Sequence, residues 1–199
     1  MDIIMATSNE NKVREINEML EGTDLHIHSL REQGIDADIE ENGTTFEENA
    51  LIKAEAIAKL TGKTVLADDS GLVIDALSGE PGVHSSRFMG EDTSYEIKNK
   101  AILDMLKDVP EQKRSARFVC SMAVVFPDGT KDVKTGVFEG RIGYEIKGEN
   151  GFGYDPIFFV PEKGMTSAEL SPEEKNAISH RGKALRMMVE ELKNRFPGA

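Results

Sequence analysis

Two adjacent carboxylates, Asp68 and Asp69, come directly after the run from Thr64 to Ala67. That run predicts a buried strand, and open α/β sheets place their ligands at the carboxyl ends of strands. Like charges side by side repel one another, and a hard divalent cation such as Mg²⁺ relieves the repulsion. The pair therefore indicates a magnesium site in which one carboxylate is also poised as a base. The alternative is an Asx-turn in which Gly71 supplies a positive φ.

A short polar segment near the start of the chain carries side chains that donate hydrogen bonds to phosphate oxygens. It consists of Thr7, Ser8, Asn9, Glu10, Asn11 and Lys12. It follows a predicted strand, Ile3 to Ala6, and precedes a helical pattern that stops at Gly22, so the positive end of a helix faces it. The glycines and the Gly-Lys-Ser/Thr ending of a Walker A loop are missing. The alternative is that Ser8 is an ordinary N-cap and Lys12 a solvated lysine.

Lys53 interrupts the apolar face of the next predicted helix. That helix begins with a capping-box pattern, Thr45 to Glu48, and apolar residues then recur on the side of the helix where Lys53 lies. Lysines are rarely buried unless they are paired. Either Lys53 extends past the edge of the core into water, or it reaches a polar site that contains phosphate or the two aspartates.

Two further acids, Glu40 and Glu41, lie in a segment that is already rich in aspartate. Such a run is commonly a solvated acidic loop. The alternative is that one of the two glutamates is a third metal ligand beside Asp68 and Asp69.

A glycine-rich loop precedes the apolar run Ile157 to Val160 and contains Phe152, Gly153, Tyr154 and Asp155. Aromatic rings between glycines offer a face on which a nucleotide base can stack. Asp155 is a candidate for holding a ribose or the edge of a base. The alternative is an ordinary loop whose aromatic rings anchor it to the core.

Local cations gather near the start of the last predicted helix, at Lys175, His180 and Arg181. Arg181 shares a helix face with Leu185 and therefore leans toward the core. Its guanidinium donates in a fixed fork that suits carbonyl or phosphate oxygens. The alternative is ordinary surface charge.

These residues need an α/β framework to position them. Strand, polar turn and helix open the chain, and Phe118 to Phe126 with Lys134 to Ile142 predict a hairpin around a Pro-Asp-Gly-Thr turn. Further helices are predicted over Tyr95 to Leu106 and after Ser171. No repeat or linker divides the chain, which favours one unit of two lobes over independent domains.

Composition excludes several classes of protein. The 199 residues include 24 Lys and Arg and 36 Asp and Glu, so the net charge is 24 − 36 = −12. An acidic chain repels a polyphosphate backbone, so no nucleic-acid polymer is expected as a partner. No apolar run is long enough for a membrane span, and a lone cysteine, Cys120, forms no internal disulfide. We therefore expect a cytoplasmic protein with no membrane partner.

Several ordered motifs together resemble the inosine/xanthosine triphosphate pyrophosphatases, which remove non-standard purine nucleotides. The motifs are Thr7-x-Asn9-x-x-Lys12, Thr45-Phe46-x-Glu48-Asn49-Ala50, Ala67-Asp68-Asp69-Ser70-Gly71-Leu72, Pro81-Gly82-Val83-x-Ser85, Gly151-Phe152-Gly153-Tyr154-Asp155-Pro156 and Ser179-His180-Arg181. The resemblance spans nearly the whole chain. Ser8 departs from it, because the family has a glycine there, and Ser86 stands where the family often has alanine.

The resemblance implies an elongated α/β fold of two lobes around a long mixed, twisted β-sheet, with the active site in the cleft between the lobes, in a single domain over residues 1–199. It also implies a homodimer and the Mg²⁺-dependent reaction NTP + H₂O → NMP + PPi on ITP, dITP and XTP. Rival interpretations are a pyrophosphatase for modified pyrimidine nucleotides and a non-catalytic nucleotide-binding protein.

The resemblance also implies a role for individual residues. Asp69 would be the general base, and Glu41 with Asp68 or Asp69 would hold the metal, with Glu40 competing for the place of Glu41. The segment Thr7 to Lys12 and Lys53 would hold the triphosphate, and Ser70 would contact the substrate. The base pocket would be formed by Phe152, Gly153, Tyr154, Asp155, Lys175, His180 and Arg181.

Overall fold

A computed structural model describes residues 1–196 of the chain, so the last three residues of the predicted domain, 197–199, lie outside the described part. The chain forms two compact units. Unit 1 comprises residues 1–69, 120–136 and the segment from 180 onward, and unit 2 comprises residues 70–119 and 137–179. Each unit carries part of the predicted site.

Seven strands hydrogen-bond in the order β2-β1-β3-β4-β5-β6-β7. The strands are β1 (Asp2–Met5), β2 (His26–Ser29), β3 (Val65–Ile74), β4 (Ser115–Val125), β5 (Lys131–Ile142), β6 (Phe158–Val160) and β7 (Met165–Thr166). The helices are α1 (Glu10–Leu20), α2 (Phe46–Thr61), α3 (Tyr95–Met105), α4 (Pro172–Ile178) and α5 (His180–Arg195). β1 pairs in parallel with β2 and β3, whereas β6 pairs antiparallel with β5 and β7. The predicted mixed α/β sheet is confirmed.

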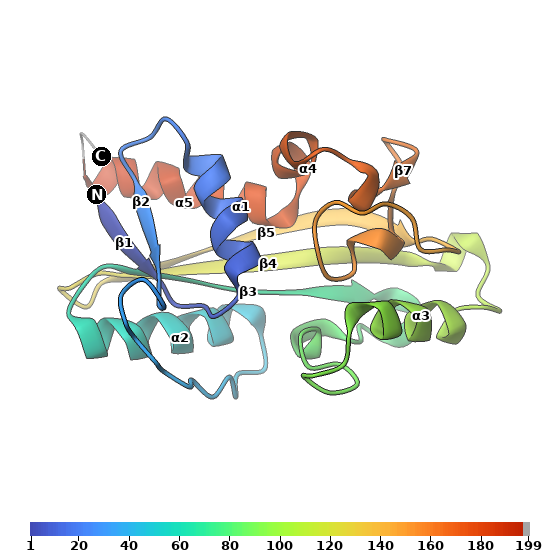
Figure 1. The fold of residues 1–199 in the computed structure, drawn as a ribbon, viewed down its shortest axis with the longest axis horizontal. Coiled ribbons are helices and arrows are strands. Elements are labelled where there is room, and N and C mark those ends of the chain that lie inside the picture. Colours follow the sequence, from blue (N-terminus) through green and yellow to red (C-terminus); the bar gives the residue numbers. More distant parts are fainter. Residues whose placement is uncertain (197–199) are drawn as a thin grey trace. The chain divides into compact units, whose positions relative to one another are not determined.

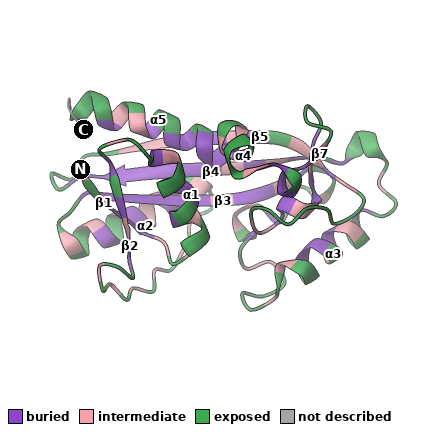
Figure 2. Ribbon diagram, turned by 45° about the horizontal axis from the view of Figure 1, so that its top comes forward, coloured by how far each residue is buried: buried purple, intermediate pink, exposed green. Residues whose placement is uncertain are grey.

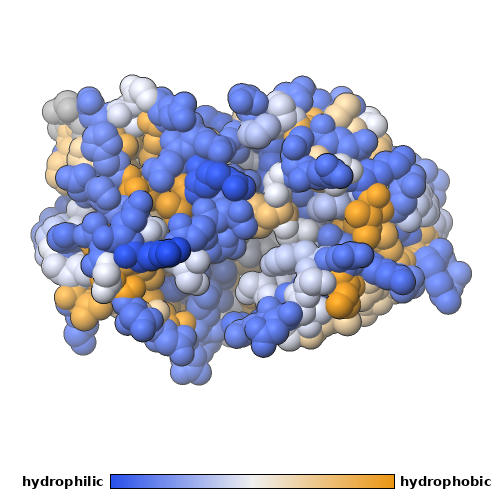
Figure 3. All heavy atoms as spheres, in the orientation of Figure 1, coloured by the Kyte–Doolittle hydropathy of each residue, from blue (hydrophilic) through white to orange (hydrophobic). Residues whose placement is uncertain are grey.

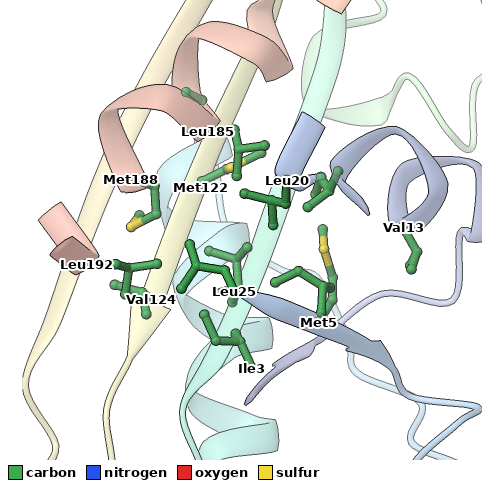
Figure 4. Close-up of a cluster of buried hydrophobic side chains, with 14 of the residues drawn as sticks. Ile3, Met5, Val13, Leu20, Leu25, Met122, Val124, Leu185, Met188 and Leu192 are labelled. Carbon is green, nitrogen blue, oxygen red and sulfur yellow. The ribbon is translucent and has the colours of Figure 1, made fainter. Parts of the chain in front are cut away.

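In unit 1 the strands have an apolar core on each face, because successive side chains of a strand point to opposite sides. On one face Ile3 and Met5 of β1 belong to the α1/α5 core, which includes Ile16 of α1 and Leu185 of α5. Ile4 of β1 points the other way. Figure 1 shows α1 and α5 on one side of these strands and α2 on the other, and Figure 4 shows the side chains that meet in the α1/α5 core.

The opposite face of unit 1 is covered by α2. Ala50, Ala54 and Ile57 of this helix pack with Ile4 and Ala67 of the strands to form the α2 core. The helix begins as the sequence predicts, since the Thr45 side chain accepts the N–H of Glu48, and it ends at Gly62, which is left-handed. The two faces of the unit 1 strands thus meet different helices.

Unit 2 has its own apolar core, in which α3 covers strand residues from β3, β4 and β6. Ile102 and Leu106 pack there with Leu72, Phe118 and Phe158. Figure 2 shows long buried stretches of β3 and β4, while the helices keep an exposed outer side. The face drawn in Figure 3 is largely hydrophilic, as the charged composition requires. Among residues 1–196, the helices are each too short or too polar to cross a membrane.

Three local features differ from the sequence-based expectations or were absent from them. The N-cap of α1 is Asn9, because its side-chain oxygen Oδ1 accepts the N–H groups of Asn11 and Lys12, so the alternative in which Ser8 is the N-cap is wrong. The short strand β2, which has a single buried isoleucine between two histidines, was not predicted. Finally, β3 does not stop before Asp68 but runs on to Ile74.

The extension of β3 also excludes the Asx-turn interpretation. Gly71 lies inside the strand and is absent from the residues with positive φ. β1 ends at Met5, which pairs with Leu66, so Asp68 and Asp69 lie beyond the carboxyl end of the neighbouring parallel strand. The two acids are therefore still at the edge of the parallel pair, where ligands are bound in such sheets.

Candidate active site

The two adjacent aspartates have different surroundings, because β3 is extended at both of them and alternate side chains leave a strand on opposite faces. Leu66 belongs to the α1/α5 core and Ala67 to the α2 core. Continuing the alternation, Asp68 points toward α1 and α5, and Asp69 points toward α2. Their hydrogen-bond partners agree with this division. The strand geometry therefore separates the two carboxylates that are adjacent in the sequence.

Asp69 is held by two side chains of α2. The amide nitrogen Nδ2 of Asn49 donates to Asp69 Oδ2 at 3.1 Å, and Lys53 Nζ lies 3.9 Å from Asp69 Oδ1. Burial raises the pKa of the Asp69 carboxyl, and the charges of Lys53 and Lys12 oppose that rise. A carboxylate that is desolvated but still oriented by an amide is suited to accept a proton.

Lys53 bridges Asp69 and Glu41, since its Nζ lies 3.0 Å from Glu41 Oε2. Of the two interpretations of this buried lysine, the structure supports the polar site and not the extension into water. Glu41 is partly buried, whereas Glu40 is exposed. The contact with Lys53 thus separates the two glutamates and favours Glu41 as the site residue.

Asp68 is fully buried and pairs with two cations of the α1/α5 side. Lys12 Nζ lies 3.0 Å from Asp68 Oδ2, and the Arg181 nitrogen Nη2 lies 3.5 Å from the same oxygen. Burial raises the pKa of the Asp68 carboxyl, but the charges of Lys12 and Arg181 outweigh it and hold that pKa well below its ordinary value. Asp68 is therefore an ionised anchor for two basic side chains.

Cys120 lies on the same side, with its Sγ 3.9 Å from Asp68 Oδ2. Burial and the nearby Asp68 charge raise the pKa of the Cys120 thiol to about 12. The thiol is thus neutral at physiological pH and is no candidate nucleophile, in keeping with its place in the α1/α5 core.

Glu15 of α1 is a site residue that sequence reasoning missed. Its Oε2 accepts from Arg181 Nη1 at 2.5 Å, and both side chains are almost completely buried. The signal was present, because Arg181 was expected to lean toward the core and a buried guanidinium requires a carboxylate partner. Glu15 lies three positions after Lys12 and hence on the same side of α1. Asp68, Arg181 and Glu15, which are buried, form one chain of alternating charge with the partly buried Lys12.

In the polar segment before α1, two side chains already accept hydrogen bonds from nearby backbone N–H groups. Thr7 Oγ1 accepts the N–H of Asn9, and Asn9 accepts the N–H groups of the first helical turn. Ser8, Glu10 and Asn11 are exposed, and Lys12 is partly buried. The donors that remain for an anion are therefore mainly the side chains and the charge of Lys12.

In unit 2, Asp155 organises the glycine-rich loop. Its Oδ2 accepts the N–H of Phe152 at 3.0 Å and Lys175 Nζ at 2.7 Å. Lys175 Nζ also lies 5.1 Å from the centre of the Phe152 ring. Gly151 has φ +72°, and a Cβ there would lie 2.2 Å from Asp155 Oδ2, so only glycine fits. Asp155 thus stabilises the loop, because its carboxylate accepts hydrogen bonds from both the Phe152 backbone and the Lys175 side chain.

The remaining predicted residues are buried or partly buried. Tyr154 is buried and its hydroxyl donates to the carbonyl of Ser85, so this ring anchors the loop, whereas Phe152 is only partly buried. His180 and Arg181 open α5 and are buried, so the interpretation as ordinary surface charge is wrong. Ser70 is the first residue of unit 2 and is partly buried.

The donor set of unit 1 suits a hard cation that is shared with phosphate. Within residues 1–196, no three His, Cys, Asp or Glu side chains are grouped so that they alone could hold a metal ion. However, the ammonium of Lys53 already lies between Glu41 and Asp69, which shows that this place accepts positive charge. Mg²⁺ commonly binds through one or two carboxylates and completes its shell with water and substrate phosphates. Glu41 and Asp69 meet that requirement.

Comparison with known proteins extends these observations over the whole chain. Residues 3–191 match the Ham1 family. A dITP/XTP pyrophosphatase of Bacillus cereus is 48% identical over 198 residues, covering 98% of this chain and 97% of the relative. Another of the same name, from Caldanaerobacter subterraneus, is 49% identical over 196 residues, with 98% and 97% covered.

Solved structures agree with the sequence comparison. A HAM1 protein from Coxiella burnetii superposes with a TM-score of 0.88 at 43% identity, covering 98% of this chain and 99% of the other. The Ham1 protein of Staphylococcus aureus gives a TM-score of 0.86 at 42% identity, with 98% and 100% covered. These matches confirm the resemblance inferred from the motifs, and the chain is a member of the Ham1 family.

Proposed function

We propose that the protein hydrolyses non-standard purine nucleoside triphosphates, such as ITP, dITP and XTP, to the monophosphate and pyrophosphate. The observation that carries this proposal is the Asp69 carboxylate, which is desolvated, oriented by Asn49 and accompanied by Lys53. The relatives named dITP/XTP pyrophosphatase, which match nearly all of this chain, support the choice of substrate.

Asp69 is the general base in this mechanism. Attack at the α-phosphorus needs a water molecule whose proton is accepted as the new P–O bond forms. Asn49 donates to Oδ2, and Oδ1 lies 3.9 Å from Lys53 Nζ, so we assign to Oδ1 the acceptance of the proton from the attacking water molecule. The raised pKa makes the carboxylate a stronger base than an exposed aspartate.

Glu41 and Asp69 would hold the Mg²⁺ ion that the reaction of this family implies. When bound, the ion supplies Lewis acidity and neutralises charge on the phosphates. We assign Asp68 a different part, as the buried anchor of Lys12 and Arg181. Lys12, Lys53 and the segment from Thr7 to Lys12 would bind the triphosphate and stabilise the charge that develops on pyrophosphate as it leaves.

The base would be selected by hydrogen bonds to its 6-oxo group. Inosine and xanthosine present an acceptor there, whereas adenine presents an amino donor. Donors on the loop from Phe152 to Asp155, or on Lys175, His180 and Arg181, satisfy the acceptor and leave adenine mispaired. Such a mismatch at a buried polar contact costs about 1–3 kcal/mol, or roughly 10–100-fold in specificity.

Replacing Lys53 by methionine tests the triphosphate site. We expect KM for ITP to rise about 10- to 100-fold, because a charge-assisted contact to phosphate is lost and methionine keeps most of the packing. The matched control is Lys59→Met on the exposed side of the same helix, which should keep KM near the wild-type value. Equal KM values for the two variants would show that Lys53 does not bind substrate.

The whole proposal is tested by measuring pyrophosphate release from ITP, XTP, GTP, ATP and a modified pyrimidine triphosphate, with Mg²⁺ and with EDTA. We expect pyrophosphate from ITP and XTP in the presence of Mg²⁺ and no turnover after chelation. Release of orthophosphate alone would contradict the reaction type. Preference for the pyrimidine, or saturable ITP binding without turnover, would support one of the rival functions.

We also propose that the protein forms a homodimer and that it is located in the cytoplasm. The resemblance to the pyrophosphatase family is the basis for both statements, and the lone buried cysteine is consistent with a reducing compartment. Sedimentation of the purified protein at several concentrations tests the dimer, and a mass of one chain, 21.9 kDa, at all of them would contradict it.

A further inference from the structure

Helix α3 carries two buried polar side chains although none of the predicted site residues lies on it. Lys98 is 0% exposed and Asn99 is 2% exposed. Burying a lysine and an asparagine is unfavourable unless each finds a hydrogen-bond partner. The hydrogen-bond acceptors of these two side chains therefore show which part of unit 2 they stabilise.

Each of them donates to the backbone of a different loop of unit 2. Lys98 Nζ donates to the carbonyl of Ser86 at 2.6 Å, and Asn99 Nδ2 donates to the carbonyl of Gly153 at 3.1 Å. The two loops are also linked directly, since the Tyr154 hydroxyl donates to the carbonyl of Ser85 at 2.6 Å. The glycine-rich loop is thus fixed from outside at two consecutive residues, Gly153 and Tyr154.

The contact of Asn99 fixes the orientation of one peptide group. A peptide is planar and trans, so its carbonyl and the following N–H point in opposite directions. Holding the Gly153 carbonyl against α3 therefore directs the N–H of Tyr154 away from that helix. Gly153 is left-handed (φ +69°) and Tyr154 follows near the right-handed region (φ −92°, ψ 4°).

This succession of conformations turns neighbouring N–H groups to one side, where they form a small electropositive concavity. Within the described part of the chain, neither the N–H of Gly153 nor that of Tyr154 has an acceptor. Two backbone donors beside Phe152 are therefore available to an electronegative atom of a ligand. The direction of the Tyr154 N–H depends on the contact between Asn99 and the Gly153 carbonyl.

We propose that Asn99 is a positioning residue for substrate selection: its amide holds the Gly153–Tyr154 peptide so that the loop presents its backbone donors to the 6-oxo group of the purine. This inference rests on the proposed function, in which the loop from Phe152 to Asp155 reads the base. Asn99 itself acts through the loop and does not touch the reacting phosphorus.

The test uses two substitutions that remove the donor and keep the size of the side chain, Asn99→Leu and Asn99→Asp. The control is Ile102→Val on the same helix, which loosens the core of unit 2 but holds no loop carbonyl. Steady-state constants for ITP and ATP are measured together with the melting temperature. We expect the ratio of kcat/KM for ITP to that for ATP to fall about tenfold or more in the Asn99 variants, through KM for ITP, with kcat within about threefold. Ile102→Val should lower the melting temperature and leave the ratio unchanged.

Asn99 variants that melt earlier, like Ile102→Val, but keep the wild-type ratio would overturn the inference and make Asn99 a purely structural residue. Because either substitution alone could prevent folding, one folded Asn99 variant is sufficient for this comparison. Lys175→Met separates the inference from the proposed function. If Lys175→Met changes the ratio and the Asn99 variants do not, only the positioning role fails. If none of these variants changes the ratio, the loop does not read the base, and both statements fail.

Discussion

Replacing Asp69 by asparagine is expected to lower kcat for ITP hydrolysis about 100-fold or more, which is the usual effect of losing a general base. Asparagine has the same shape and can still meet Asn49 after its amide is turned, so the fold should be preserved. KM should change much less than kcat, because Lys12 and Lys53 remain to bind the triphosphate. Steady-state kinetics with a pyrophosphate assay, together with a thermal melt, measures both quantities.

The control for Asp69→Asn is Asp132→Asn, a substitution of the same kind in unit 1. Asp132 pairs with Lys134 at the surface and has no part in the proposed chemistry. Its kcat should equal that of the wild type. An Asp69→Asn variant with near-normal turnover would remove Asp69 from the role of base, and a large loss for both variants would point to a general effect of charge.

Replacing Arg181 by leucine is expected to reduce the free energy of unfolding by about 3–5 kcal/mol, because it leaves the buried carboxylates of Glu15 and Asp68 without their shared guanidinium. Lys12 still neutralises Asp68, but the contact that Glu15 makes with Arg181 is lost. Urea denaturation followed by circular dichroism gives the value.

Helix α5 supplies a matched control in Arg195→Leu. Arg195 also forms an ion pair, with Asp128 at 2.7 Å, but this pair is exposed and should contribute less than about 1 kcal/mol. The double variant Glu15→Leu/Arg181→Leu should lose less stability than the sum of the two single variants, since it no longer buries the unpaired Glu15 carboxylate. Equal effects of Arg181→Leu and Arg195→Leu would show that the chain of alternating charge does not stabilise unit 1.

The long helices and the apolar strands could be predicted because they carry strong local signals. The capping residues Thr45 and Ser171 begin helices as predicted. The place of Lys53 on an apolar face left two alternatives, and its burial selects the polar site. β2 escaped prediction because one buried isoleucine between histidines has too little periodicity. Its formation depends on pairing with β1, which is a tertiary contact.

It was easier to predict which residues belong to the site than which side of the sheet each of them faces. The motif Asp68-Asp69 indicates a concentration of negative charge whether or not the strand continues. Which carboxylate meets which helix depends on β3 running on to Ile74, and the following Ser-Gly dipeptide resembles a turn in the sequence. The sequence signalled that Arg181 would need a carboxylate partner, but the partner could be identified as Glu15 only when α5 and α1 were seen to meet within unit 1.

The alternation along β3 has a consequence for engineering this enzyme. Deleting or inserting one residue between Leu66 and Asp68 would shift the two acids by about 3.3 Å and send each to the opposite side of the sheet. Asp68 would then no longer reach Lys12 and Arg181, and Asp69 would no longer reach Asn49. Libraries that seek an altered substrate range should therefore vary residue identity in this strand while keeping its length constant.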